Sequence, residues 1–370
     1  MSNCRDWSRR EVLKLAGAAA VASVTTHSAY PATPFSMPGL YPGQVVGVAH
    51  ADSSINFQYQ TAPIQAMIRR GIMELTRTSN YVTGWRKLFQ PGDVVGIKVN
   101  PNGFYTIVSS QACLMEIING LVLAGIGPKD IVVYERQQDL LSNILPWLPS
   151  WVRYSWASPA YLDDQTGISG YDPDQYVDLP QFLLPWQNAN NPVHTRSHAA
   201  LFASRQVTKI ISLPVLKDHN GAGVTLSLKN LSNGCSNNVN RAHPDVSTNY
   251  LQDFIPNVVS MPVIRNKTVL TIIDGVHGLY AWGPYGGDGS YVWENKTMYF
   301  ATDLVAADRI GWRVIDAKRV AMGLLPEQVS PPDFVGGMLV RQPQHIVFAG
   351  QMGLGEYRDD YIAFRTITLK

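Results

Sequence analysis

Lysine and histidine side chains gather in one apolar stretch of the chain, "LPVLKDHNGAGVTLSLKNLSNG", which covers residues 213–234 and is called here the lysine–histidine segment. His219 stands two residues after Lys217, and a neighbouring cation lowers the pKa of an imidazole, which keeps it a base at neutral pH. The surrounding glycines let the backbone approach a ligand closely. Lys229 and Asn230 follow, where a helix or strand would turn one face to the same site. The segment predicts a centre in which lysines hold an anion and Lys217, His219 and Lys229 carry acid–base chemistry.

Further polar residues stand where other expected strands end. Lys98 and Asn100 close the run "VVGIKVN", and Asp274 follows "TVLTII". Ligands of open α/β sheets bind beyond the carboxyl ends of the strands, and an unpaired ammonium is costly to bury. We therefore expect Lys98, Asn100, Asn230 and Asp274 to bind the ligand in one crevice with the lysine–histidine segment. Two alternatives stay open: Lys98 could extend into solvent, and Asp303, after "TMYFAT", fits a helix N-cap.

Histidine spacing leaves a metal site as an alternative. His194 and His198 are four residues apart, a spacing that places two imidazoles on one helix face, but they lack the acidic residue of the zinc-protease motif. His243 and His277 could join His219 and Asp274 as nitrogen and oxygen ligands, although no spacing fixes the set. His219 and His243 are the predicted metal ligands of this alternative.

The beginning of the chain predicts an exported protein. "SRREVLKL" contains Arg9 and Arg10 in the pattern of a twin-arginine signal, and an alanine-rich stretch follows as far as Val24. That stretch is about half of the ~20 residues that a membrane-spanning helix needs. With processing expected between Ser28 and Ala32, the twin-arginine translocation machinery is a predicted partner. The mature protein is expected in the periplasm or outside the cell, exported in its folded state.

The charge balance of the mature chain argues against some partners. The chain has 30 Lys and Arg against 28 Asp and Glu, and removal of residues 1–32 leaves 26 of each, because that segment holds four basic residues and two acidic ones: Arg5, Arg9, Arg10, Lys14, Asp6 and Glu11. A neutral chain without a long basic run argues against a general nucleic-acid binder. No second long apolar segment occurs, so we expect no membrane span in the mature chain.

Alternating hydrophobic patterns predict an α/β fold with a mostly parallel sheet flanked by helices. Helical patterns cover 61–78, 110–124 and 303–316, and strand-like runs cover 45–49, 94–100, 131–135, 208–214, 268–274 and 297–302. Between about 137 and 192 the pattern gives way to Trp, Tyr, Pro and Asn, which predicts an ordered aromatic-rich insertion that forms a lid or wall. We expect one domain over residues 33–370, with its core at about 90–325.

Five segments occur in the order seen in a known family: "VVGIKVNPNG", "KIISLPVLKDHNGAGVTLSLKNLSNG", "NRAHPD", "VLTIIDGVHGLYAWGP" and "ATDLVAADRIGWRVI". Over roughly residues 90–325 the chain resembles the family catalogued as domain of unknown function 362, in its twin-arginine-exported branch. The Lys-x-His pair followed by Leu-Lys-Asn is the most specific element. The resemblance implies a fold more than a reaction.

The resemblance also bears on cofactors. Other members often carry ferredoxin-type cysteine motifs, whereas the mature chain keeps only Cys113 and Cys235, so no iron–sulfur cluster is expected. A looser similarity runs to the nickel-pincer racemases of the lactate racemase type. There a His near glycines and a Lys holds a nucleotide-derived metal cofactor, and Lys217, His219 and Lys229 look like that arrangement. A metal or such a cofactor is therefore a candidate ligand.

These observations lead to one expectation with an alternative. We expect an exported enzyme, isomerase-like, racemase-like or redox, that acts on a small anionic substrate by Lys/His acid–base chemistry, with or without a metal-containing cofactor. The alternative is a non-catalytic extracytoplasmic binding protein for an anionic ligand or metal cofactor. Both require distant lysines and histidines to meet in one pocket at the edge of the sheet.

Overall fold

A large mixed sheet organises the chain in the computed structural model, which describes residues 30–370 except 104, 106, 159–166, 244–249, 288 and 328–342. The twin-arginine pattern at Arg9 and Arg10 lies outside the described residues. The main path of the sheet has the strand order β15-β1-β14-β12-β9-β4-β5-β6. From one edge to the other these strands are Ala363–Leu369, Gln44–His50, Thr297–Ala301, Thr268–Leu279, Lys209–Ser212, Val95–Lys98, Ile131–Tyr134 and Arg153–Ser155.

The half of the sheet that carries the candidate residues is parallel. β12, β9, β4, β5 and β6 pair in parallel, whereas β14 pairs antiparallel with both β12 and β1. Short strands extend the path: β10 (Val215–His219) runs parallel to β12, and β11 (Gly223–Val224) and β13 (Val292–Glu294) pair antiparallel with β10 and β12. The predicted α/β fold with a mostly parallel sheet is confirmed.

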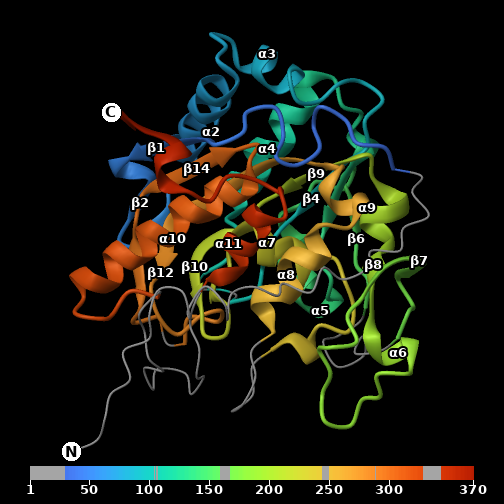
Figure 1. Cartoon of the computed structure of the whole chain (residues 1–370). Coiled ribbons are helices and arrows are strands. Elements are labelled where there is room, and N and C mark those ends of the chain that lie inside the picture. The colour runs from blue at the N-terminus through green and yellow to red at the C-terminus, as the bar shows by residue number, and fades with distance from the viewer. Residues whose placement is uncertain are drawn as a thin grey trace, which may run out of the picture.

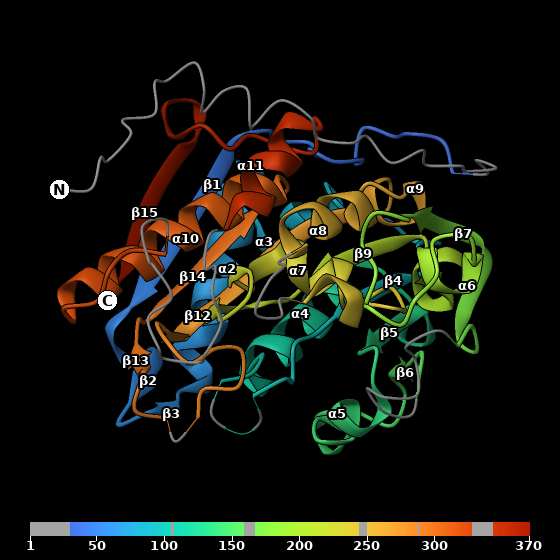
Figure 2. The ribbon, with the colours of Figure 1, turned by 60° about the horizontal axis from the view of Figure 1, so that its bottom comes forward.

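Helices cover both faces of this sheet (Figures 1 and 2). One face packs on α2 (Thr61–Thr76), α3 (Tyr81–Arg86) and α4 (Gln111–Ala124). The other packs on α7 (Leu226–Ser232), α8 (Leu251–Val259), α10 (Leu304–Ala321) and α11 (Gln344–Gln351). Because the central strands are buried on both faces, they read as continuous apolar runs, which is why the sequence predicted them.

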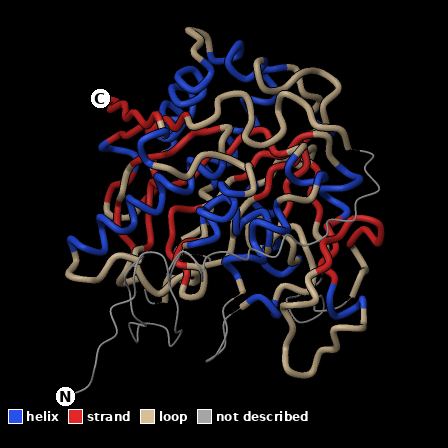
Figure 3. Tube along the Cα trace, in the orientation of Figure 1, coloured by secondary structure: helices blue, strands red, loops and turns tan. Residues whose placement is uncertain are grey.

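The remaining elements are small and lie mostly towards the two ends of the sheet; Figure 3 shows strands in the interior with helices and loops around them. They are a hairpin, a two-stranded sheet and three short helices: β2 (Ser54–Ile55), β3 (Gln58–Tyr59), β7 (Tyr171–Asp178), β8 (Arg196–Ala200), α5 (Gln138–Ser142), α6 (Pro192–Thr195) and α9 (Pro262–Arg265). None of the described helices combines the length and the apolar character that crossing a bilayer requires.

Two expectations from the pattern differ from the structure. The aromatic-rich stretch at 137–192 is not only an insertion, since β6 within it forms an edge strand of the main sheet. His194 lies in α6 and His198 in β8, so they do not share a helix face. The three residues of β6 are too few and too polar for a periodicity argument to detect, because an edge strand need not be apolar on either face.

Candidate functional site

Three neighbouring parallel strands place the predicted residues at one edge of the sheet. Lys98 ends β4 and lies in register with Ser212 of β9 and Tyr134 of β5. The chain after β9 continues into β10, which ends at His219. The carboxyl ends of parallel strands meet at one edge, so residues from 98–100, 135–136 and 217–219 converge there.

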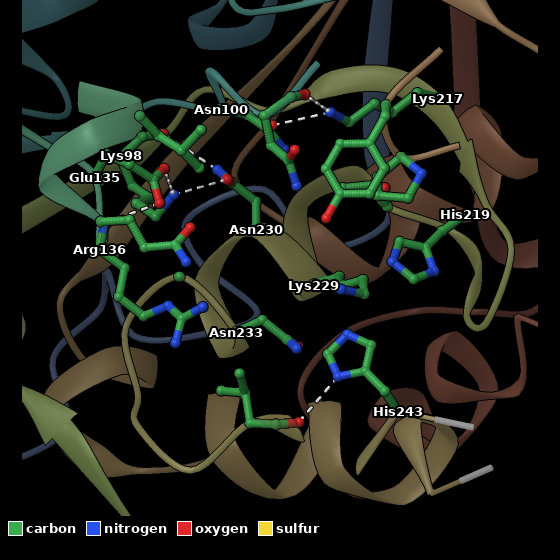
Figure 4. A pocket seen from close by; sticks show the side chains of 18 of the residues that line it. Lys98, Asn100, Glu135, Arg136, Lys217, His219, Lys229, Asn230, Asn233 and His243 are labelled. Atoms are coloured by element: carbon green, nitrogen blue, oxygen red, sulfur yellow. Dashed lines mark hydrogen bonds and ion pairs between the residues drawn. The ribbon is translucent and has the colours of Figure 1, made fainter. Parts of the chain in front are cut away.

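The convergence forms a pocket of about 400 Å³ (Figure 4). Of the eight residues expected to gather, the pocket contains every one except Asp274. These seven are Lys98, Asn100, Lys217, His219, Lys229, Asn230 and His243. Their chemical roles remain predictions. The contacts of each side chain divide the set into residues that build the walls and residues that face the cavity.

Lys98 and Asn230 build a wall. The Lys98 ammonium donates to Glu135 Oε2 at 2.7 Å, to the Val99 carbonyl at 2.7 Å and to Asn230 Oδ1 at 3.1 Å. The Asn230 amide donates to the Lys98 carbonyl and to Ser212 Oγ, both at 3.2 Å. An ammonium has three donors, and all three are used here. Lys98 and Asn230 could therefore bind a ligand, as the sequence predicts, only if one of these internal partners is displaced. The position of a residue at the end of a strand does not reveal such partners.

Lys217 faces the cavity without a counter-ion. Its ammonium donates to Asn100 Oδ1 at 3.0 Å and to the Asn102 carbonyl at 2.5 Å, and it makes no ion pair within the described residues. Burial, followed by the charge of Lys229, lowers the pKa of Lys217 to about 7. Both acceptors are neutral, so the positive charge is solvated but not compensated.

Lys229 is the least satisfied cation of the pocket. Its side chain is only 8% exposed, and within the described part of the chain it makes no hydrogen bond and no ion pair. Burial, followed by the charges of Arg136 and Lys98, lowers the pKa of Lys229 to about 7. Figure 4 shows Lys229 between the rings of His219 and His243, with Asn233 beside it.

The first turn of α7 holds Lys229 in this place. Leu226 opens the helix with a φ of 46°, a left-handed conformation that is strained for a branched residue. The buried carboxylate of Asp308 on α10 accepts from the backbone N–H groups of Ser227 and Leu228, both at 2.8 Å. These bonds satisfy the donors that a helix start leaves open, so α10 fixes the direction in which Lys229 points.

The two histidines of the pocket are neutral and hold their protons on different nitrogens. His219 Nδ1 accepts from the backbone N–H groups of Gly221 and Ala222 at 3.0 and 3.1 Å, so its proton is on Nε2. His243 Nδ1 lies 3.0 Å from the Val239 carbonyl and must donate to it, so its Nε2 carries a lone pair. The rings are 6.0 Å apart. The pocket thus offers one imidazole donor and one imidazole acceptor.

Burial and the positive charge of Lys229 keep both rings neutral. They lower the pKa of His219 well below its usual value, and they lower the pKa of His243 to about 3. A bound anion would act in the opposite direction and raise the pKa of both imidazoles, because an opposite charge favours the protonated form.

Several pocket residues were not expected. Glu135 and Arg136 follow β5 and line the cavity; the strand-end rule applied to "IVVY" would have found them. Asn233 also lines it, and its buried Nδ2 has no acceptor among the described residues. His345 of α11 does not line the cavity; it is fully buried with both ring nitrogens unpaired in the described structure, and burial together with the charge of Lys229 lowers its pKa to about 3. No sequence signal connects His345 with this pocket.

Asp274 lies elsewhere. Its carboxylate accepts from the Ser110 backbone N–H at 2.9 Å, from Ser110 Oγ at 2.6 Å and from the Val276 N–H at 3.3 Å, and it does not line the pocket. Burial raises the pKa of Asp274. These bonds tie the start of α4 to β12, and the expected role of Asp274 in ligand binding stays a prediction. Asp303 is the N-cap of α10, as the alternative expected.

We predict that Asp274→Ala lowers the free energy of unfolding by about 1–3 kcal/mol, because it leaves buried donors of Ser110 without an acceptor. The affinity of the pocket for anions should stay within twofold of the wild-type value. Urea unfolding and calorimetric titration with oxalate measure the two quantities. If the loss in the free energy of oxalate binding were much larger than the loss in the free energy of unfolding, Asp274 would belong to the anion site.

The described residues do not complete a protein-held metal centre. Among them, no three His, Cys, Asp or Glu side chains are placed to bind one metal ion. His219 and His243 are a pair of imidazoles, and His219 Nδ1 is occupied by backbone donors. His277 instead bonds to Ser54 Oγ at 2.8 Å, and its ring packs in a tilted arrangement against Tyr59 with the ring centroids 4.1 Å apart. Two nitrogen ligands do not fit a protein-bound metal of the usual kind.

Similarity to a known protein family extends over some of the residues of the pocket. No curated protein matches the chain. A family model described as Domain of unknown function (DUF362) matches residues 188–313. This range contains the lysine–histidine segment and His243, whereas Lys98, Asn100 and Glu135 precede it. Over residues 188–313, the match supports the family expected from the sequence, domain of unknown function 362.

Proposed function

We propose that this protein is an exported enzyme that binds a small anionic substrate, a carboxylate or a phosphate, in the pocket and transfers a proton on it. The observation that carries the proposal is the buried ammonium of Lys229, which has no partner among the described residues and faces two neutral histidines. Export is supported by the pattern around Arg9 and Arg10.

The charges of the pocket favour an anion. Four cationic side chains and two carboxylates line it. Glu135 compensates Lys98 with an ion pair of 2.7 Å, whereas Lys217 and Lys229 are buried ammonium groups that make no ion pair among the described residues. Burying an uncompensated cation costs several kcal/mol, and an anion that enters the pocket removes that cost. The site is therefore more stable with an anion than without one.

The histidines favour chemistry over simple capture. A protein that only binds an anion needs cations and hydrogen-bond donors. An imidazole that presents a lone pair, such as His243, does not stabilise an anion. In an occupied pocket His243 Nε2 can accept a proton from the substrate, and His219 Nε2–H can donate a hydrogen bond to an oxygen on which negative charge develops. The anion raises the pKa of His243 towards the working pH, so His243 can act as a base when the substrate binds.

Calorimetric titration tests the binding step. We expect wild-type protein to bind oxalate, pyruvate and inorganic phosphate, and the Lys217→Met/Lys229→Met variant to lose at least tenfold in affinity for each. Lys129→Met, a change at an exposed lysine away from the pocket, is the matched control and should bind as the wild type does. Equal affinities for the double variant and the control would overturn the proposal.

Solvent exchange tests the proton transfer. In D₂O, catalysed loss of the methyl protons of pyruvate is followed by NMR. We expect His219→Gln and His243→Gln each to slow this exchange by roughly 10²-fold or more, the usual contribution of a general base or of a donor to developing negative charge. Binding of all three anions without any exchange above the uncatalysed rate would instead identify a non-catalytic binding protein.

Anion affinity should decrease as pH rises through about 7. The pKa values of Lys217 and Lys229 are both lowered to about 7, so each lysine loses its charge above that pH. If binding requires these protons, affinity falls by roughly tenfold per pH unit for each lysine involved. Oxalate is the appropriate probe because its own charge stays constant from pH 6 to 9. An affinity for oxalate that is flat over this range would show that the lysines do not hold the anion.

A further inference from the structure

The three lysines of the pocket differ in their hydrogen bonds. The Lys98 ammonium has three acceptors, including a carboxylate, and the Lys217 ammonium has two. Lys229 has none within the described residues. In its charged form Lys229 attracts an anion together with Lys217. In its neutral form the Lys229 amine has no partner among the described residues to give up before its lone pair can react.

The surroundings of Lys229 supply the neutral amine that such a reaction needs. The nitrogen is buried, and the neighbouring Arg136 and Lys98 are cationic. Both conditions disfavour the ammonium, and the pKa of Lys229 is lowered to about 7, so about half of the molecules hold a free amine at neutral pH. An amine that is desolvated beside other cations is the arrangement that activates a lysine as a nucleophile.

We propose that Lys229 forms a Schiff base with the carbonyl carbon of a small anionic oxo compound, an oxo acid in its simplest form. This inference rests on the proposed function, because Lys217 holds the anionic group of the same substrate. The 400 Å³ pocket has room for a short-chain acid, and the unpaired Nδ2 of Asn233 provides a donor for its oxygen atoms.

The two histidines fit the proton transfers of this reaction. The lone pair of Lys229 Nζ adds to the carbonyl carbon, and the electron pair of the carbonyl moves to the oxygen, which accepts a hydrogen bond from His219 Nε2–H. His243 Nε2 takes one proton from the nitrogen and gives it to this oxygen, which becomes a hydroxyl group. His243 then takes the second proton of the nitrogen and gives it to the hydroxyl group, which leaves as water while the C=N bond forms. Amine and carbonyl become imine and water, with no oxidant or reductant.

Borohydride trapping tests the inference. The full-length protein is incubated with pyruvate or glyoxylate, treated with sodium borohydride and measured by intact mass spectrometry and peptide mapping. With pyruvate we expect one adduct per chain, with the mass of pyruvic acid less one oxygen atom, located on Lys229. Lys229→Arg keeps a cation in the pocket but offers no nucleophilic amine, and it should give no adduct. Lys129→Met should be labelled as the wild type is.

The outcomes separate this inference from the proposed function. Calorimetry on the same samples shows whether pyruvate binds. Bound pyruvate without a borohydride adduct would overturn the Schiff base and leave the anion pocket standing, as would equal labelling of the Lys229→Arg variant. Absence of pyruvate binding together with absence of phosphate and oxalate binding would overturn both.

Discussion

Lys229→Met is expected to make the protein more stable and to remove much of its affinity for anions. Methionine fills nearly the same volume as lysine and needs no counter-ion in a buried position. Exchanging an uncompensated buried charge for an apolar side chain should raise the free energy of unfolding by about 1–4 kcal/mol. Urea unfolding and oxalate titration of the same variant measure the two opposite effects.

The pH dependence identifies the cause of that gain. In the folded state the pKa of Lys229 is lowered from 10.5 to about 7, so the folded protein binds fewer protons than the unfolded chain between these values. Below pH 7 the lysine is charged in both states and its burial cost is complete, and the cost disappears as pH rises towards 10.5. The stabilisation by Lys229→Met should therefore be largest near pH 6 and smaller at pH 9.

Lys267 provides the matched control for a buried lysine. It is 8% exposed, like Lys229, but its ammonium donates to the carbonyls of Ala203, Ser204 and Val207 at 2.6, 3.0 and 2.9 Å. Lys267→Met leaves three buried carbonyls without that donor and should lower stability by about 1–3 kcal/mol. If Lys229→Met were destabilising at pH 6 to the same extent as Lys267→Met, Lys229 would have partners that compensate its charge.

The second large effect is expected at Glu135. Its carboxylate is the counter-ion of Lys98, and the two side chains are 8% and 2% exposed. Glu135→Gln leaves a buried ammonium without its charged partner, so we expect a loss of about 3–5 kcal/mol in the free energy of unfolding. The change also weakens the wall of the pocket, because the same ammonium holds Asn230. Thermal and urea unfolding measure the loss.

A double-mutant cycle shows whether the pair causes that loss. Lys98→Met combined with Glu135→Leu removes both charges and should recover most of the stability that Glu135→Gln alone loses. Losses that simply add, with the double variant less stable than either single variant, would mean that Lys98 and Glu135 act independently.

The sequence predicted the frame of the site because its signals are local. The runs that form β4, β5, β9 and β12 are apolar on both faces, as buried parallel strands require. Polar residues at the ends of such strands must meet at one edge, and the pocket brings together Lys98, Asn100, Lys217 and His219.

Partners between distant segments could not be predicted in this way. Whether a buried lysine builds a wall or faces a ligand depends on the acceptors around its nitrogen, and for Lys98 two of the three, Glu135 and Asn230, are distant in the sequence. Asp274 ends the predicted run, but β12 continues to Leu279 and Ser110 donates to the Asp274 carboxylate. His345, whose pKa the charge of Lys229 lowers, belongs to a helix near the end of the chain. Such pairings depend on tertiary packing, which no spacing along the chain records.

The charge state of Lys229 tests the central claim most directly. With lysines labelled with ¹³C at the ε-carbon, the Lys229→Met spectrum assigns the signal, and its pKa is measured by NMR titration with and without oxalate. We predict a pKa near 7 in the free protein and a higher value with the anion bound. A signal that titrates near 10.5 in both samples would contradict the claim that Lys229 is buried without a counter-ion and binds an anionic ligand.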